Sequence, residues 1–242
     1  MSTQRLGGCR QLATVLAVSV IVLFATGMAD AQTIRPIMGE YQTKAAGRVE
    51  LVNDSDRPLT VVVEPRGFSV DATGEIRDEP MPATVRVRLS AMTLRVPPRQ
   101  TRFVFYEAEA ETAPAWFVLY AVFSGYQPRD FNGLNVQLEL PHLVYILPRE
   151  RWQATDLVVD AQLDRNRRVM VVDVRNQGRL FGRISELELA AGSTSARVPG
   201  FALFPGGLRR LEVPWTGEEQ PRAVTLKSSD FSVRRPLSLD PR

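Results

Sequence analysis

The feature that most constrains this chain is its succession of short β-branched and apolar stretches, separated by Pro, Gly, Asn and Asp. Helical periodicity is scarce, and apolar stretches bounded by turn residues are typical of β-strands. The sequence therefore predicts an all-β protein. The expected strands comprise residues 48–52, 59–64, 84–89, 101–106, 116–123, 134–140 and 142–147, then 157–163, 168–175, 183–189, 196–198, 209–213, 223–227 and 231–235.

The strand pattern restarts after a polar stretch, residues 148–151, that begins with proline. We place a domain boundary there, which gives domains of residues 32–148 and 149–242. Each has about the length of an immunoglobulin-like β-sandwich. The sequence thus predicts two immunoglobulin-like β-sandwich domains, and a single large barrel is the alternative architecture.

The N-terminal residues predict export. Arg5 and Arg10 precede an apolar run, residues 12–24, and a small-x-small motif ends at Ala31. This is the pattern of a signal peptide, which we assign to residues 1–31 with cleavage after Ala31. An uncleaved membrane anchor is the alternative, but it needs about 20 apolar residues. The single cysteine, Cys9, lies before the cleavage site, so we expect packing without disulfides to hold the mature chain together.

The composition argues against several classes of function. The 30 Lys and Arg residues are interspersed with 27 Asp and Glu residues, without the basic stripe expected of a nucleic-acid partner. With His142 as the one histidine and no cysteine after residue 9, neither a Ser-His-Asp or Cys-His system nor a Cys/His zinc site is expected. We expect no enzyme activity, no catalytic residue, no cofactor, no metal and no small-molecule substrate.

Two acidic groups invite a calcium-binding interpretation, because oxygen atoms are the ligands of calcium. Glu107, Glu109 and Glu111 occupy alternate positions of one stretch, which favours a solvated strand face. Asp54 and Asp56 flank a serine without the glycine and glutamate of a calcium-binding loop, which favours a turn.

One stretch, residues 133–148, is the most informative part of the chain. In its first half, apolar residues alternate with Asn135, Gln137 and Glu139, so that one face of the expected strand is apolar. The apolar positions are Leu134, Val136, Leu138 and Leu140. Residues 143–147 are apolar on both faces, as in a strand buried between two layers. An ordinary edge strand that closes its own sandwich is the alternative interpretation.

This stretch resembles the last strand of the first domain in periplasmic pilus chaperones, where alternating apolar residues lead into an aromatic-x-x-Pro hinge. Tyr145 to Pro148 matches that hinge. Other segments that resemble the family follow in matching order, namely residues 47–53, 94–103, 172–178 and 204–207. The resemblance covers essentially the whole chain after residue 31, and Pro141 before the hinge is closer to divergent branches of the family.

The resemblance implies a chaperone domain at residues 32–148 that lends a strand to pilus or fimbrial subunits and delivers them to an outer-membrane usher. It implies a periplasmic location and a role in pilus assembly, fimbrium biogenesis and cell wall organization. Leu134, Val136, Leu138 and Leu140 would fill the groove of the subunit. Arg35 is a candidate contact for the terminal carboxylate of the subunit, whereas Leu143 stands where the best-known branch has a lysine. The alternative is an exported structural or adhesive pilus component with immunoglobulin-like domains.

Overall fold

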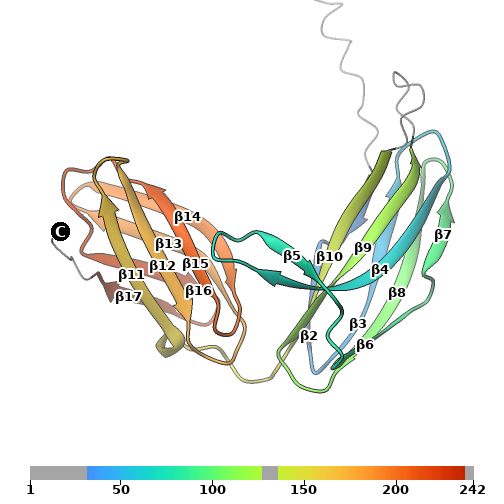
Figure 1. The fold of residues 1–242 in the computed structure, drawn as a ribbon, viewed down its shortest axis with the longest axis horizontal. Helices are drawn as coiled ribbons and strands as arrows, with labels where there is room; N and C mark the ends of the chain where they lie inside the picture. The colour runs from blue at the N-terminus through green and yellow to red at the C-terminus, as the bar shows by residue number, and fades with distance from the viewer. Residues whose placement is uncertain (1–31, 127–135, 238–242) are drawn as a thin grey trace, which may run out of the picture.

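The computed structural model describes residues 32–126 and 136–237, and nearly all of its regular structure is β. Ten strands precede residue 148 and seven follow it within these ranges (Figure 1). They are β1 (Gln32–Arg35), β2 (Met38–Gln42), β3 (Lys44–Asn53), β4 (Leu59–Val70), β5 (Ile76–Glu79), β6 (Val85–Leu89), β7 (Thr93–Val96), β8 (Gln100–Ala110), β9 (Ala115–Tyr126), β10 (Val136–Leu147), β11 (Leu157–Asp164), β12 (Val169–Asn176), β13 (Gly182–Ala191), β14 (Thr194–Leu203), β15 (Leu208–Pro214), β16 (Ala223–Ser228) and β17 (Ser232–Pro236). One short 3-10 helix, Ala154–Asp156, precedes β11. No helix in these ranges is long and apolar enough to cross a membrane.

The strands form two immunoglobulin-like β-sandwiches, as the sequence predicts. In the first, the sheet β1-β3-β8-β6 faces the sheet β2-β10-β9-β4-β5, and β7 also pairs with β4. In the second, the sheet β11-β12-β15 faces the sheet β14-β13-β16-β17. Each sandwich has its own hydrophobic core, because alternate residues of its strands turn inward. The exact domain bounds, 32–148 and 149–242, remain our proposal.

Several strands differ from the prediction. The strands β1, β2, β5 and β7 were not expected, and β4 continues to Val70 rather than ending at residue 64. Pro65 explains the early stop in the prediction, since proline is normally excluded from central strands. In the structure, β7 pairs with β4 at residues 59–62 and β5 pairs with it at residues 67–70. Pro65 lies in the gap between them, where one side of β4 has no strand partner.

A buried asparagine closes a turn in each sandwich. The Asn53 side-chain amide donates to the carbonyl oxygens of Arg57 at 2.7 Å and of Val96 at 3.0 Å. In the second sandwich, the Asn176 amide donates to the carbonyl of Leu180 at 2.7 Å. Buried polar groups need such partners. The predicted turn at residues 54–56 is therefore confirmed, and it follows from an amide that satisfies the backbone of the turn.

The two sandwiches are joined by more than the linker between them. An aromatic cluster of Phe68 and Tyr145 from the first sandwich and Phe181 and Phe204 from the second is buried between them. The Tyr145 and Phe181 rings stack with centroids 4.8 Å apart, and Phe68 meets Phe204 edge to face at 5.9 Å. The polar stretch at residues 148–151 therefore does not separate two bodies that share few contacts.

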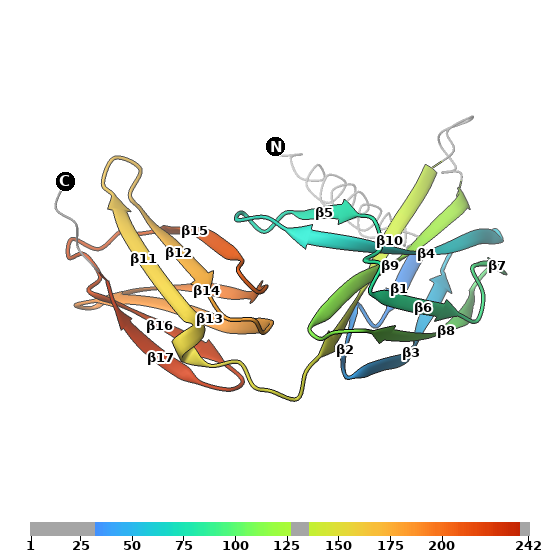
Figure 2. The ribbon, with the colours of Figure 1, turned by 60° about the horizontal axis from the view of Figure 1, so that its bottom comes forward.

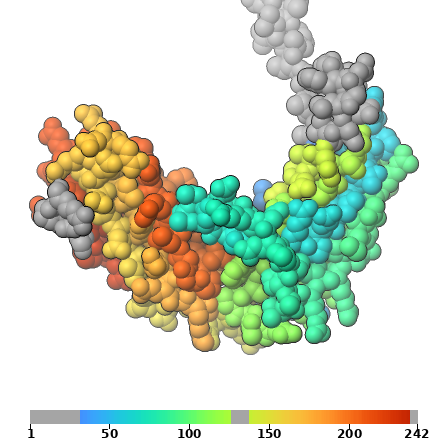
Figure 3. Space-filling model, viewed as in Figure 1, coloured from blue at the N-terminus to red at the C-terminus, as the bar shows by residue number. Residues whose placement is uncertain are grey.

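The β4–β5 hairpin forms a second connection, and it reaches across to β15 (Figure 2). At its tip, the Ala72 carbonyl accepts a hydrogen bond of 2.7 Å from the backbone N–H of Arg210. The Asp71 carboxylate accepts from the Thr73 hydroxyl at 2.7 Å and from neighbouring backbone N–H groups, which lowers its pKa to about 2 and orders the tip. The space-filling view shows the hairpin extending from one sandwich to the other beside a broad hollow (Figure 3).

Candidate partner-binding edge

One edge of strand β10 is paired along nearly its whole length, whereas the opposite edge is paired along only part of it. It pairs with β9 from Val136 to Ile146, whereas β2 pairs with it in parallel from Leu143 onward. Among the described residues, no strand pairs with the outer side of β10 between Val136 and His142. We call this part of the strand the free edge. Unpaired edges of this kind are templates for strand addition.

The pairing with β2 shows which backbone groups point outward. The Leu143 N–H donates to the Ile37 carbonyl at 2.9 Å, so Leu143 directs its backbone groups toward β2. Because these groups alternate in direction along a strand, Gln137, Glu139 and Pro141 direct theirs to the free edge. Proline has no N–H. The free edge therefore offers N–H and C=O groups at Gln137 and Glu139 but only a C=O group at Pro141.

The predicted apolar face is present where the structure describes it. Leu138 and Leu140 are half-buried and pack against the margin of the first core. Gln137 and Glu139 are exposed, as expected for the opposite face. Val136 is placed in the strand by its backbone. Leu134 lies outside the described residues.

Beyond the free edge, β10 is buried on both faces, as the sequence predicts. Val144 and Ile146 lie in the core of the first sandwich. Leu143 and Leu147 pack on the opposite face, against the aromatic cluster that contains Tyr145. The two layers that bury this part of β10 are therefore the core of the first sandwich and the second sandwich. The aromatic position of the hinge contributes directly to the contact between the two sandwiches.

His142 lies where the free edge ends, and it is completely buried. Its Nδ1 is 2.7 Å from the Pro36 carbonyl oxygen, which can only accept, so Nδ1 carries a proton. Burial lowers the pKa of His142, although the Pro36 hydrogen bond opposes this, and the ring is neutral. Nε2 then accepts from the Tyr106 hydroxyl at 2.8 Å, and the Tyr106 oxygen accepts from the Tyr41 hydroxyl at 2.7 Å. Burial raises the pKa of Tyr106, so it stays protonated.

The two positions compared with the family carboxylate anchor have different surroundings. Arg35 is exposed at the end of β1, one residue before Pro36, and it has no ion pair with another described residue. Leu143 is half-buried in an apolar setting. A cation that the sequence did not indicate is Arg183, whose guanidinium binds Glu40 of β2 at 2.9 Å and lies 5.6 Å from the centroid of the Tyr145 ring. No sequence signal would have found it, since it comes from β13.

A charged cluster lies beside the free edge on the outer face of its sheet. Arg66 binds Glu64 at 2.8 Å and Asp78 at 3.0 Å, and it is 3.6 Å from Glu139. The Tyr120 hydroxyl donates to Asp78 at 2.8 Å. Burial, and to a smaller extent this hydrogen bond, raises the pKa of Tyr120 to about 12. Because the charges are paired and partly exposed, we expect this cluster to contribute little to stability.

The carboxylates considered for calcium form a solvated face, as predicted. Lys44 binds Glu109 at 2.8 Å and Glu107 at 3.6 Å, and all three side chains are exposed. Within the described ranges, no group of three or more His, Cys, Asp or Glu residues is arranged to hold a metal ion.

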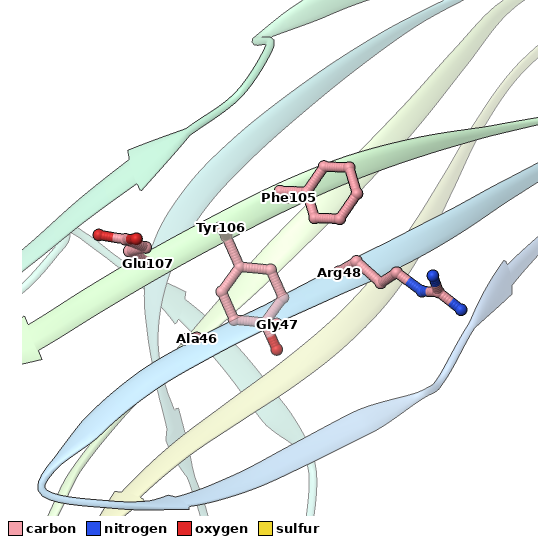
Figure 4. Close-up of a pocket in the computed structure, with 6 residues that line it drawn as sticks. All are labelled: Ala46, Gly47, Arg48, Phe105, Tyr106 and Glu107. Carbon is pink, nitrogen blue, oxygen red and sulfur yellow. The ribbon is translucent and has the colours of Figure 1, made fainter.

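An open pocket of about 370 Å³ lies on the outer face of the β1-β3-β8-β6 sheet (Figure 4). Its lining residues are Ala46, Gly47, Arg48, Phe105, Tyr106 and Glu107. The Tyr106 hydroxyl is already bonded to His142 and Tyr41. The pocket thus presents a hydrophobic wall and two charged side chains, without a nucleophile and base in contact.

Comparison with known proteins identifies the fold. No protein-family model matches the sequence, and no curated protein matches it. Solved structures do match. The class 5 fimbriae chaperone CfaA superposes with a TM-score of 0.56 at 12% sequence identity, covering 86% of this chain and 99% of CfaA. The YadV chaperone gives a TM-score of 0.54 at 13% identity and covers 84% of this chain and 99% of its own. The E. coli chaperone DraB gives a TM-score of 0.51 at 13% identity and covers 87% of this chain and 97% of its own.

These matches extend over both sandwiches, because each covers more than four-fifths of this chain. The chain therefore has the fold of two-domain fimbrial chaperones. At these sequence identities the likeness establishes the fold. The arrangement of the edge strand gives this fold a place where another strand can be added.

Proposed function

We propose that this chain is a periplasmic chaperone of pilus or fimbrial subunits, which binds them by donor-strand complementation and delivers them to an outer-membrane usher for assembly. The observation that carries the proposal is the free edge of β10, in which an unpaired backbone edge and the half-buried Leu138 and Leu140 occur together. The fold of fimbrial chaperones supports it.

The mechanism follows from the physics of strands. A pilus subunit that lacks its last strand exposes an apolar groove and unpaired backbone groups, and an added strand covers both; chaperone–pilin complexes are a known case of such β-augmentation. Here the backbone of Gln137 and Glu139 would supply the hydrogen bonds. Leu134, Val136, Leu138 and Leu140 would enter the groove, each contributing about 1.5–3 kcal/mol at full burial before the costs of association.

Two further parts of the proposal depend on the same reasoning. Export with cleavage after Ala31 would bring the chain to the periplasm, where Arg35 is a candidate contact for the carboxylate of the subunit. A non-catalytic role is supported by His142, whose two ring nitrogens both form hydrogen bonds within the fold.

The alternative function, a pilus component, would need an N-terminal extension that it donates as a strand to a neighbouring subunit, whereas β1 is paired with β3 of its own sandwich.

The experiment is co-expression with a fimbrial subunit encoded next to the gene of this chain. We expect soluble subunit to be recovered from the periplasm in a one-to-one complex, and to aggregate or be degraded when the chain is absent. Recovery of equally soluble, monomeric subunit without the chain would contradict the proposal.

A further inference from the structure

Strand β10 changes from an unpaired to a paired edge within three residues. Glu139 is the last residue that offers an outward N–H, Pro141 lacks one, and Leu143 already binds Ile37. His142 lies between Pro141 and Leu143, and its side chain points into the core of the first sandwich. The residues that hold the segment 36–42 against β10 therefore decide where the free edge ends.

A single imidazole ring is connected to both ends of that segment. Its Nδ1 donates to the Pro36 carbonyl at 2.7 Å, and its Nε2 reaches Tyr41 through the hydroxyl of Tyr106. Two glycines make room for this chain of hydrogen bonds. A Cβ atom at Gly39 would lie 2.7 Å from Cε2 of Tyr41, and one at Gly47 would lie 2.6 Å from the Tyr106 hydroxyl.

Burial of side chains does little to hold the segment. Ile37 is 65% exposed and Met38 is 40% exposed. Along β2, exposed and half-buried residues alternate, and none is fully buried. Apart from the ion pair between Glu40 and Arg183 and the partly buried Tyr41 ring, the segment is held by backbone pairing with β10 and by the hydrogen bonds that lead to His142. Loss of those bonds would leave a strand with little apolar burial to keep it in place.

We propose that His142 is a positioning residue that holds segment 36–42 against β10 and thereby sets where the free edge ends. This inference rests on the proposed function and deepens it, because the length of the free edge decides which partner fits. The partner is an extended segment whose backbone pairs with Gln137 and Glu139 and which stops short of Ile37. A longer pairing is prevented by the missing N–H of Pro141 and by the seated segment.

The test is hydrogen–deuterium exchange on the free, full-length mature protein, with peptides from segment 37–42 compared with peptides from β9. In His142→Gln, whose amide replaces Nε2 but does not reach Pro36, we expect segment 37–42 to exchange about tenfold faster, the factor for losing about one hydrogen bond. Exchange in β9 should stay unchanged. In His142→Asn, whose shorter amide places an N–H near the position of Nδ1, protection of the segment should be retained.

Val104→Ala is the matched control, because Val104 is buried in the same core without contributing to these hydrogen bonds. It should speed exchange throughout the sandwich. The inference is overturned if His142→Gln leaves segment 37–42 unchanged, or speeds exchange in β9 to the same extent. If that variant does not fold, Tyr106→Phe, which removes only the linking hydroxyl, must speed exchange near Tyr41 instead. Because the measurement uses no subunit, failure of this inference and failure of the chaperone function are separate results.

Discussion

Substitution of Leu138 by glutamate separates binding from folding, and its effect on the free protein follows from the position of the side chain. Leu138 is half-buried at the margin of the first core. Full burial of a leucine is worth about 1.5–3 kcal/mol, so the half-buried side chain contributes roughly 1 kcal/mol. A carboxylate at the margin can turn toward water. We expect the melting temperature to fall by about 4–8 °C, the shift for 1 kcal/mol in a sandwich of about 100 residues.

In a complex, the same carboxylate would have to enter an apolar groove without a partner. Such burial costs several kcal/mol. A cost of about 3 kcal/mol would lower the affinity for a subunit by more than about 100-fold. Loss of binding should therefore far exceed the loss of stability, which is the feature that distinguishes a donor strand from an ordinary edge strand.

The assay is recovery of a co-expressed fimbrial subunit in soluble form, measured together with thermal unfolding of the isolated variant. Gln137→Glu adds the same charge on the exposed, opposite face of β10, and it should leave unfolding nearly unchanged. The reasoning is refuted if Leu138→Glu unfolds the isolated protein. It is equally refuted if the variant remains folded and still keeps the subunit soluble as well as the unmodified chain does.

Three further predictions concern stability, domain organisation and processing. Because burial lowers the pKa of His142 in the folded state, the unfolded state binds a proton first as the pH falls below about 6.5. Stability should therefore fall by up to about 1.4 kcal/mol per pH unit below that pH. Tyr106, which faces the ring, stays neutral there because burial raises its pKa, and His142→Asn should remove this slope in chemical denaturation. Trypsin should cut first within the exposed stretch 149–151, while the aromatic cluster keeps the two halves together until denaturant is added; early cleavage elsewhere with this stretch intact would contradict the proposed boundary. The protein recovered from the periplasmic fraction should have Gln32 as its N-terminal residue, as N-terminal sequencing would show. A membrane-bound product that retains residues 12–24 would contradict export with cleavage.

Most of the strands could be predicted from the sequence. Alternating apolar residues and turn formers predicted the seven strands of the second sandwich and six of those in the first, because strand formation depends on which residues turn toward a core. They did not predict β2 and β5, whose residues are largely exposed. Strand β2 forms by pairing with the distant β10, and β5 forms a hairpin with β4 without an apolar face of its own. The continuation of β4 through Pro65 depends on a gap between two other strands, which local sequence does not encode.

The candidate site likewise has some features that the sequence predicts and others that only the structure shows. The apolar face of β10 and the two apolar faces of residues 143–147 follow from alternation, and the sequence alone determined them. Only the tertiary structure decided which side of β10 is unpaired, since that depends on where β2 begins to pair. From the sequence, His142 is the one histidine and no catalytic role is expected of it, but its hydrogen-bond partners lie 36 and 106 residues away in the chain. Pairing between distant segments decides both features, because a strand edge and a buried ring each need partners that only the folded chain brings together.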